Sequence, residues 1–322
     1  MGDPATVPGD DRPRRSRRVH IGQSDPVQWR TRTFSLVTRG GMRYNREVAE
    51  RDRRPDPHGS VERDVLVRYL DAWTATVLRS QRGGTYVECG AFAADAFRVF
   101  GEFADRLGGH HLEVVLVGAA VPAAVPAVPA GLVVRTAGDL ADVRVAGPVL
   151  AHLAGAWPPS LVRGKAHEVL LAAAPGTDDR ERLRAAGLGC AVAVDLVAED
   201  GTARTLVFAT ADSRHLATFK NELWAVDEFA GIRYRDPRDA GGTLVDISLT
   251  PQLLPLRRAL LAELARRGAA TLAELQRFTL LETIYRPEDA VGALTAAVAA
   301  GQVGREPEKG RLSPRTVLSA LR

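Results

Sequence analysis

The sequence predicts an α/β fold in which a largely parallel sheet is followed by a small helical domain. Short continuous apolar runs alternate with amphipathic segments between residues 84 and 175, a pattern typical of parallel strands covered on both faces. An Asp-Gly pair at 200–201 lies between two β-rich runs, which indicates an antiparallel hairpin. After residue 250 the apolar period becomes helical, so we expect a separate helical domain there.

The elements of the sheet domain are expected in a regular order. A helix N-capped by Ser60 comes first, because apolar residues recur at helical spacing from there to residue 80. The next elements are strands near 85–91, 112–120, 131–139, 147–157 and 164–175, with helices at 93–107 and 213–226 and a hairpin at 189–212. A parallel sheet that ends in an antiparallel hairpin indicates a class I methyltransferase-like, Rossmann-type fold.

The C-terminal residues predict a winged helix-turn-helix. Thr271 and Glu274 form a capping box at the start of the second of three short helices, and a charged hairpin-like segment at 302–314 is the expected wing. The predicted domains are a basic, largely disordered tail at 1–57, a methyltransferase-like α/β domain at 58–250 and a winged-helix domain at 251–322.

Composition limits where the protein acts and what it contacts. Both ends of the 322-residue chain carry an excess of basic residues around an acidic middle, which favours DNA or RNA as a partner; an arginine- and alanine-rich overall composition is the alternative explanation. No apolar run is long enough to cross a membrane, and we expect a cytoplasmic protein without membrane contact. Cys89 and Cys190 lie in apolar runs and are expected to be buried, reduced thiols, with no metal site.

The loop after the first predicted strand is where a methyltransferase-type sheet binds S-adenosylmethionine. Such loops carry several glycines because the backbone must approach the cofactor closely, yet here Gly90 stands alone and Phe92 follows it. Glu88 is the remaining carboxylate that can bind a cofactor amine; alternatively, it caps the next helix or pairs with an arginine. We interpret Glu88 and Gly90 as a vestigial cofactor site.

Two further positions lack the polar groups that methyl transfer needs. No carboxylate for ribose hydroxyls follows the second strand, from 114 to 122. After the fourth strand, the stretch Ala-Trp-Pro-Pro at 156–159 offers no amide or carboxylate to hold a target nitrogen, and His152 has no partner at catalytic spacing. We therefore expect no catalytic residue and no cofactor, with S-adenosylmethionine as the cofactor if the protein is active.

Two segments carry a resemblance to a known family. They are "ERDVLVRYLDAW" at 62–73 and "FKNELWAVDEFAGIRYRDP" at 219–237, and the C-terminal helices follow with similar spacing, including "TIYRPEDAVGAL". The chain thus resembles the three-Cys-motif partner proteins, a bacterial family found beside a separate cysteine-motif protein. The resemblance implies a protein partner, such as a cysteine-motif enzyme, that carries the three cysteines itself.

The second of these segments supplies residues expected at the joint between the two predicted domains. Trp224 and Phe229 are expected to wedge between them. Charge-assisted hydrogen bonds across the joint are expected from Asp227, Arg233 and Arg235. The alternative is a surface that binds the partner protein through Trp224 and these three charged residues.

The predicted wing offers basic side chains for phosphate contacts. Arg305, Lys309 and Arg311 lie in it, whereas the third helix, at 288–300, offers no Arg, Asn or Gln to read base edges. The pattern therefore fits two roles equally well: weak, salt-dependent contact with nucleic acid, and docking of another protein.

The observations together favour a non-catalytic partner or adaptor protein of the three-Cys-motif partner type, with weak nucleic-acid binding. Two alternatives remain open at this point. One is an active S-adenosylmethionine-dependent methyltransferase acting on nucleic acid, and the other is a winged-helix nucleic-acid-binding regulator.

Overall fold

The computed structural model describes residues 56–80, 83–118, 128–145, 147–155, 157, 162, 167–227 and 231–321. Residues Arg53–Arg322 belong to one compact unit. Nearly all of the predicted N-terminal tail lies outside the described residues. The first described helix begins at Pro57 rather than at Ser60, whose hydroxyl donates to the carbonyl of Asp56, so the predicted N-cap is wrong by one turn.

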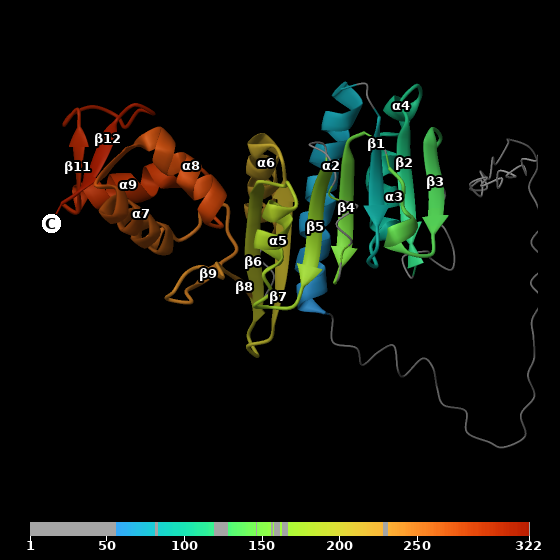
Figure 1. Cartoon of the computed structure of the whole chain (residues 1–322), viewed down its shortest axis with the longest axis horizontal. Coiled ribbons are helices and arrows are strands. Elements are labelled where there is room, and N and C mark those ends of the chain that lie inside the picture. Colours follow the sequence, from blue (N-terminus) through green and yellow to red (C-terminus); the bar gives the residue numbers. More distant parts are fainter. Residues whose placement is uncertain are drawn as a thin grey trace, which may run out of the picture. The chain divides into compact units, whose positions relative to one another are not determined.

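One mixed sheet of nine strands, in the order β3-β2-β1-β4-β5-β7-β6-β8-β9, dominates the described part of the chain (Figure 1). Strands β1 to β5 are parallel, and β7, β6, β8 and β9 each run antiparallel to their neighbours. The strands are β1 (Gly84–Glu88), β2 (Leu112–Val117), β3 (Leu132–Ala137), β4 (Val149–Ala154), β5 (His167–Ala173), β6 (Cys190–Ala198), β7 (Ala203–Thr210), β8 (Ile232–Arg235) and β9 (Leu244–Asp246). The predicted parallel sheet and the β6–β7 hairpin are confirmed, whereas β8 and β9 extend the sheet beyond the prediction.

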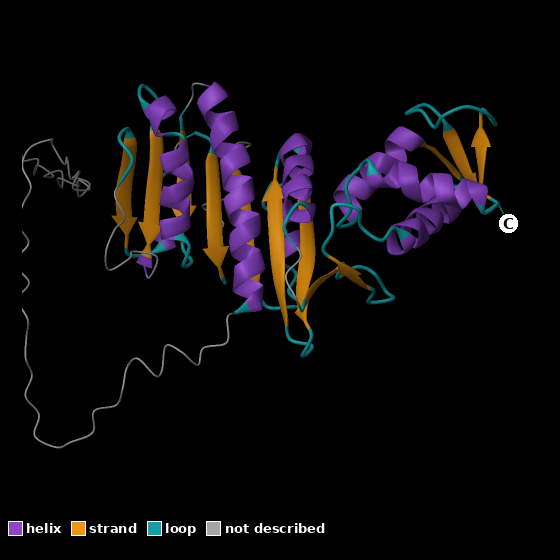
Figure 2. Cartoon of the chain, turned by 180° about the vertical axis from the view of Figure 1, so that it is seen from behind, coloured by secondary structure: helices purple, strands orange, loops and turns teal. Residues whose placement is uncertain are grey.

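Helices cover both faces of this sheet. On one face α2 (Pro57–Ser80), α3 (Ala93–Glu102) and α6 (Ser213–Trp224) share a core with inward side chains such as Tyr86 and Leu150 (Figure 2). On the other face α5 (Asp179–Ala185) packs against β6 and β7, and alternate strand residues such as Val87 and Ala151 belong to the core cluster of that face. The predicted helix at 93–107 is interrupted at Phe103, after which α4 (Ala104–Leu107) forms a separate turn. Neighbouring strand residues thus belong to different core clusters, as a sheet buried on both sides requires.

The C-terminal residues combine three helices with a small antiparallel sheet. The elements are α7 (Leu254–Arg267), β10 (Ala269–Thr271), α8 (Leu272–Glu282), α9 (Asp289–Ala299), β11 (Val303–Glu306) and β12 (Val317–Ala320), with β12 in the middle of the sheet. The predicted capping box is confirmed: Thr271 accepts from the amide of Glu274, and the Glu274 carboxylate accepts from the amide of Thr271. Among the described helices none combines the length and apolar character needed to cross a membrane.

Candidate functional site

The strand order places one edge of the sheet where α/β proteins commonly bind ligands. Strand β1 pairs with β2 on one side and with β4 on the other, so the direction in which strands are added reverses between β1 and β4. Ligands of open α/β sheets bind beyond the carboxyl ends of the strands at such a reversal. Glu88 is the last residue of β1, and its register partner in β4 is His152.

The Glu88 carboxylate at this edge is buried and fully engaged by the protein. It accepts hydrogen bonds from the backbone amide of Gly90 at 2.6 Å and from the hydroxyl of Tyr86. Its Oε1 lies 2.8 Å from Nδ1 of His152. Glu88 therefore neither caps the following helix nor pairs with an arginine within the described residues; its cationic partner is a histidine.

His152 joins this carboxylate to a second one on α2. Its Nε2 lies 3.1 Å from Oε1 of Glu62, and Arg204 donates to the other oxygen of Glu62 at 2.9 Å. His152 has no solvent exposure, and burial opposes its charge, but Glu88 and Glu62 outweigh that cost and raise its pKa to about 9. Two carboxylates, an imidazolium and a guanidinium thus form a network beneath the carboxyl end of β1, and Arg204 extends it to Asp56 at 3.1 Å.

Sequence reasoning missed this network because its members come from α2, β1, β4 and β7, far apart in the chain. The available signal was a glutamate on the otherwise apolar face of the first helix, where Glu62 precedes Val65 and Leu66. A charged residue in that position requires a buried partner.

The backbone at Gly90 is close to this network. A Cβ on Gly90 would lie 2.8 Å from Cε1 of His152 and 3.0 Å from Oε1 of Glu88. The ring of Phe92 lies 5.5 Å from the His152 ring, centroid to centroid. The single glycine of this loop is therefore required by the protein's own imidazole, which occupies the space next to the Gly90 backbone.

The regions after β2 and β4 are described only in part. Residues 119–127, and with them the last four residues of the stretch 114–122 that lacks a ribose-binding carboxylate, lie outside the described residues, as do Ala156, Pro158 and Pro159. Trp157 is described: it is buried in the core beside Val87, and its Nε1 donates to Oδ1 of Asp179 at 3.3 Å. The residue that follows the fourth strand thus contributes an indole to the core of the sheet.

Trp224 lies where the sheet-bearing part meets the C-terminal helices. It is fully buried at the end of α6, and its Nε1 donates to the carbonyl of Ile284 at 3.0 Å. Its ring stacks on Tyr285 and meets Tyr234 edge-on. Phe229, expected to act with it, lies outside the described residues. A fully buried indole has no surface left to offer a partner.

Lys220, one helical turn before Trp224, makes the densest polar contact of this joint. Its ammonium donates to the carbonyls of four residues at and after the end of α8, at 3.0, 2.6, 2.6 and 2.8 Å, namely Thr279, Leu280, Thr283 and Tyr285. Burial lowers the pKa of Lys220 to about 7, against the opposing effect of nearby carboxylates, of which Asp236 is the strongest. A cation is well placed here because the carbonyl end of a helix carries partial negative charge.

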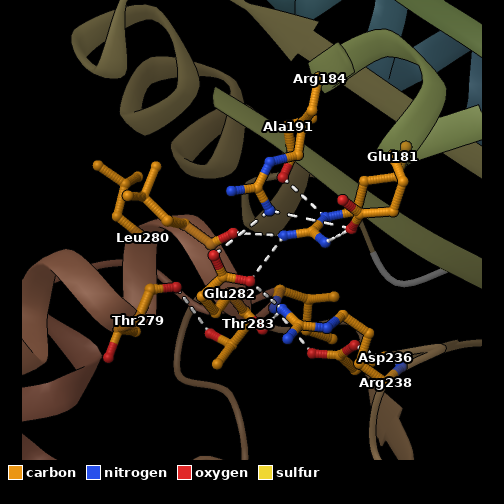
Figure 3. Close-up of polar contacts among 12 residues, drawn as sticks. Glu181, Arg184, Ala191, Asp236, Arg238, Thr279, Leu280, Glu282 and Thr283 are labelled. Carbon is orange, nitrogen blue, oxygen red and sulfur yellow. Dashed lines mark hydrogen bonds and ion pairs between the residues drawn. The ribbon is translucent and has the colours of Figure 1, made fainter. Parts of the chain in front are cut away.

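Glu282, the last residue of α8, forms a second charged contact across the joint (Figure 3). It is bound by three arginines of the sheet-bearing part. Arg180 donates to it at 2.9 Å, Arg184 at 3.3 Å and Arg238 at shorter range. Arg180 also donates to the carbonyls of Ala191 and Leu281, so it connects β6 to α8 directly.

The residues expected to supply charges across this joint are placed elsewhere. Asp227 lies 4.0 Å from Arg68 on α2, and its side chain is 90% exposed. Arg235 binds Asp195 of the neighbouring strand β6, through Nε at 3.0 Å and Nη2 at 2.8 Å. Arg233 is exposed on β8 and has no hydrogen bond or ion pair with any other described residue. The expectation was wrong because Asp227 and Arg235 pair within the sheet-bearing part, and Lys220 and the three arginines make the contacts instead.

The basic residues of the predicted wing differ in their contacts. Arg305 donates to the carbonyls of Pro307 and Lys309, so its guanidinium is held against its own loop. Lys309 and Arg311 are exposed and make no side-chain hydrogen bond or ion pair to the rest of the described chain. These two cations are the ones available to an external anion.

The cysteines have the chemistry of inert thiols. Burial, followed by the charge of Glu88, raises the pKa of Cys89 to about 12, and burial also raises the pKa of Cys190. Neither forms a disulfide. The part of the chain that the structure describes contains no cluster of His, Cys, Asp and Glu suited to a metal ion.

Comparison with known proteins gives no family for this chain. No protein-family model matches the sequence, and no curated protein matches it significantly.

Proposed function

We propose that this protein is a non-catalytic, methyltransferase-like scaffold that acts as the partner or adaptor subunit of another protein, as in the three-Cys-motif partner family. The strand order β3-β2-β1-β4-β5 followed by an antiparallel hairpin supports a class I methyltransferase-like sheet. The order α7-β10-α8-α9-β11-β12, with β12 between β10 and β11, supports a winged helix. The two resembling segments at 62–73 and 219–237 support the family.

One observation carries the non-catalytic part of the proposal: His152 lies against Gly90 and between Glu62 and Glu88. A cofactor amine that bound Glu88 would have to displace the imidazolium from both carboxylates and leave the buried Glu62 with Arg204 as its remaining partner. Removing one member of a buried ion pair costs about 3–5 kcal/mol, which a ligand would have to offset before gaining any affinity. The Glu88 carboxylate is already bound by groups of the protein itself.

Calorimetric titration of the full-length chain with S-adenosylmethionine and S-adenosylhomocysteine tests this proposal. We expect no saturable heat at ligand concentrations up to about 1 mM, which corresponds to a binding free energy weaker than about −4 kcal/mol. The matched variants are Glu88→Gln and Glu113→Gln, since Glu113 is a carboxylate on the neighbouring strand that pairs with Arg135. Micromolar binding that is lost in the first variant and kept in the second overturns the proposal, as does methyl transfer from labelled cofactor to DNA or RNA.

A second function, weak contact with nucleic acid through the wing, is favoured by the two unpaired cations Lys309 and Arg311. A phosphate contact made by such a side chain releases counterions, so affinity falls as salt rises. The test is a fluorescence titration of a labelled DNA duplex at several salt concentrations. Replacing both residues by alanine should reduce the slope of log affinity against log salt by about 2, and binding that does not respond to salt removes this function.

A further inference from the structure

A cleft of about 500 Å³ is lined by residues of α7 and α8. Arginines from both helices line it, and the half-buried side chains of Phe278 and Leu281 provide an apolar floor. At one end it reaches Glu282, the residue that the three arginines of the sheet-bearing part hold (Figure 3). The cleft is therefore adjacent to the joint, on the described surface formed by α7 and α8.

Two of the lining arginines are held in place by a buried carboxylate. Glu263 accepts from Nε and Nη2 of Arg266 at 2.9 and 2.8 Å, and from Nε of Arg267 at 2.5 Å. The Arg266 hydrogen bond is the main cause that lowers the pKa of Glu263, so this carboxylate stays ionised at neutral pH. The Glu263 side chain is 7% exposed, whereas those of Arg266 and Arg267 are 66% and 37% exposed. The buried Glu263 carboxylate thus holds the guanidinium groups of Arg266 and Arg267 at the cleft, where they remain accessible to solvent.

The other lining carboxylates are also already bound. Glu274 accepts from the amide and hydroxyl of Thr271 in the capping box, and Glu282 is held by its arginines. Arg277 is different, because it is exposed and has no hydrogen bond or ion pair within the described residues. Of the three arginines and three glutamates that line the cleft, only Arg277 has no partner among the described residues, so its guanidinium is available to a carboxylate of a ligand.

We propose that this cleft docks an acidic peptide segment of a protein partner, with a carboxylate on Arg277 and a large apolar side chain on Phe278 and Leu281. Guanidinium groups bind carboxylates bidentately, and an aromatic and aliphatic floor favours an apolar anchor. A continuous polyanion fits less well, because its successive phosphates would meet Glu263 and Glu274 on the same surface. This inference deepens the proposed adaptor function and rests on it.

Selection from a random peptide library displayed on phage tests the docking site, with immobilised full-length protein as target and the Arg277→Glu variant for counter-selection. We expect enriched peptides to combine Asp or Glu with Leu, Ile, Phe or Trp a few positions away. A synthetic peptide from the enriched set, labelled with fluorescein, should lose about tenfold or more in affinity for Arg277→Glu and should bind more weakly at high salt.

The matched control is Arg315→Glu, a charge reversal at another exposed arginine of the C-terminal part, which should change peptide affinity less than about twofold. Because both exchanged residues are exposed, both variants should be folded, which melting curves followed by circular dichroism will check. The inference is overturned if no peptide is enriched over the counter-selection, if enriched peptides lack acidic residues, or if Arg277→Glu binds them as the parent does. A labelled single-stranded DNA that binds in an Arg277-dependent manner where no peptide does would assign the cleft to nucleic acid instead.

The two proposals fail separately. If no peptide binds the cleft and no cofactor binds the protein, the docking inference fails and the scaffold proposal stands. If S-adenosylmethionine binds saturably, the scaffold proposal fails and the peptide result is unchanged.

Discussion

The ammonium of Lys220 lies 2.6 Å from the carbonyl oxygen of Thr283, the first residue after helix α8. Three more carbonyls of the same turn share this cation. The contact ties α6, which packs on the sheet, to the end of a helix in the C-terminal part.

Replacing Lys220 by methionine should destabilise the protein by about 3 kcal/mol or more, because carbonyls at a helix end would remain buried without donors. Urea unfolding of the full chain measures the change. Lys309→Met is the control. Because Lys309 is exposed in the predicted wing, this substitution should change the free energy of unfolding by less than about 0.5 kcal/mol. Equal midpoints for Lys220→Met and the parent would contradict the contact.

Adding a single methyl group at Gly90 should be costly. The Cβ of Gly90→Ala would approach Cε1 of His152 to 2.8 Å, closer than packed side chains allow, and we expect a loss of about 1–3 kcal/mol. Gly108→Ala is the control, because a Cβ there meets nothing within 4 Å and its backbone is extended. If His152 is the obstacle, the two changes Gly90→Ala and His152→Ala will not be additive, and additive costs would exclude it.

The network around His152 should make stability fall at alkaline pH. Its folded-state pKa of about 9 exceeds the ordinary histidine value of about 6.5, so the folded state binds more protons between these values. The resulting stabilisation is complete below pH 6.5, is lost as pH rises through 9, and amounts to about 3 kcal/mol at most.

Urea midpoints between pH 6 and 9.5, compared for the parent and His152→Gln, report this contribution. Glu62 and Glu88, which face position 152, and their partners Arg204 and Tyr86 are present in both proteins. The buried Tyr86 hydroxyl, whose pKa is raised by burial and then by Glu88, stays protonated throughout. The difference between the two proteins should therefore shrink with rising pH. A constant difference would show that His152 is neutral in the fold.

Two arginines on the same strand should behave differently. Arg235→Ala removes the partner of Asp195, whose side chain is 5% exposed, and should cost about 2–4 kcal/mol. Arg233→Ala, two residues earlier on the same side of β8, should be nearly neutral because Arg233 is exposed and has no hydrogen bond or ion pair with any other described residue. Thermal melting of the two variants distinguishes them, and equal losses would show that the pairing with Asp195 contributes nothing.

The sheet could be predicted because its strands are continuous apolar runs bounded by turn residues, and the hairpin because Asp-Gly separates two β-rich runs. Strands β8 and β9 could not, since they span only Ile232–Arg235 and Leu244–Asp246 and depend on pairing with β6 for their conformation. Short strands carry too little periodicity to be recognised locally.

The candidate site shows the same division between local and long-range information. Glu88 and Gly90 could be located from the strand that precedes them. The partner of Glu88 could not, because His152 is 64 residues away and nothing in its own neighbourhood indicates an ion pair. Lys220 was overlooked for a related reason: its acceptors are main-chain carbonyls, which every sequence contains.

The use of main-chain carbonyls as acceptors affects how the joint tolerates mutation. Because Lys220 and Trp224 both bind backbone oxygens, the side chains at Leu280 and Ile284 can be exchanged without removing an acceptor. Related chains are therefore expected to retain Lys220 and Trp224 while their side chains diverge at the end of α8, where the acceptor carbonyls lie. Sequence similarity at this joint should then be found on the donor side, in α6.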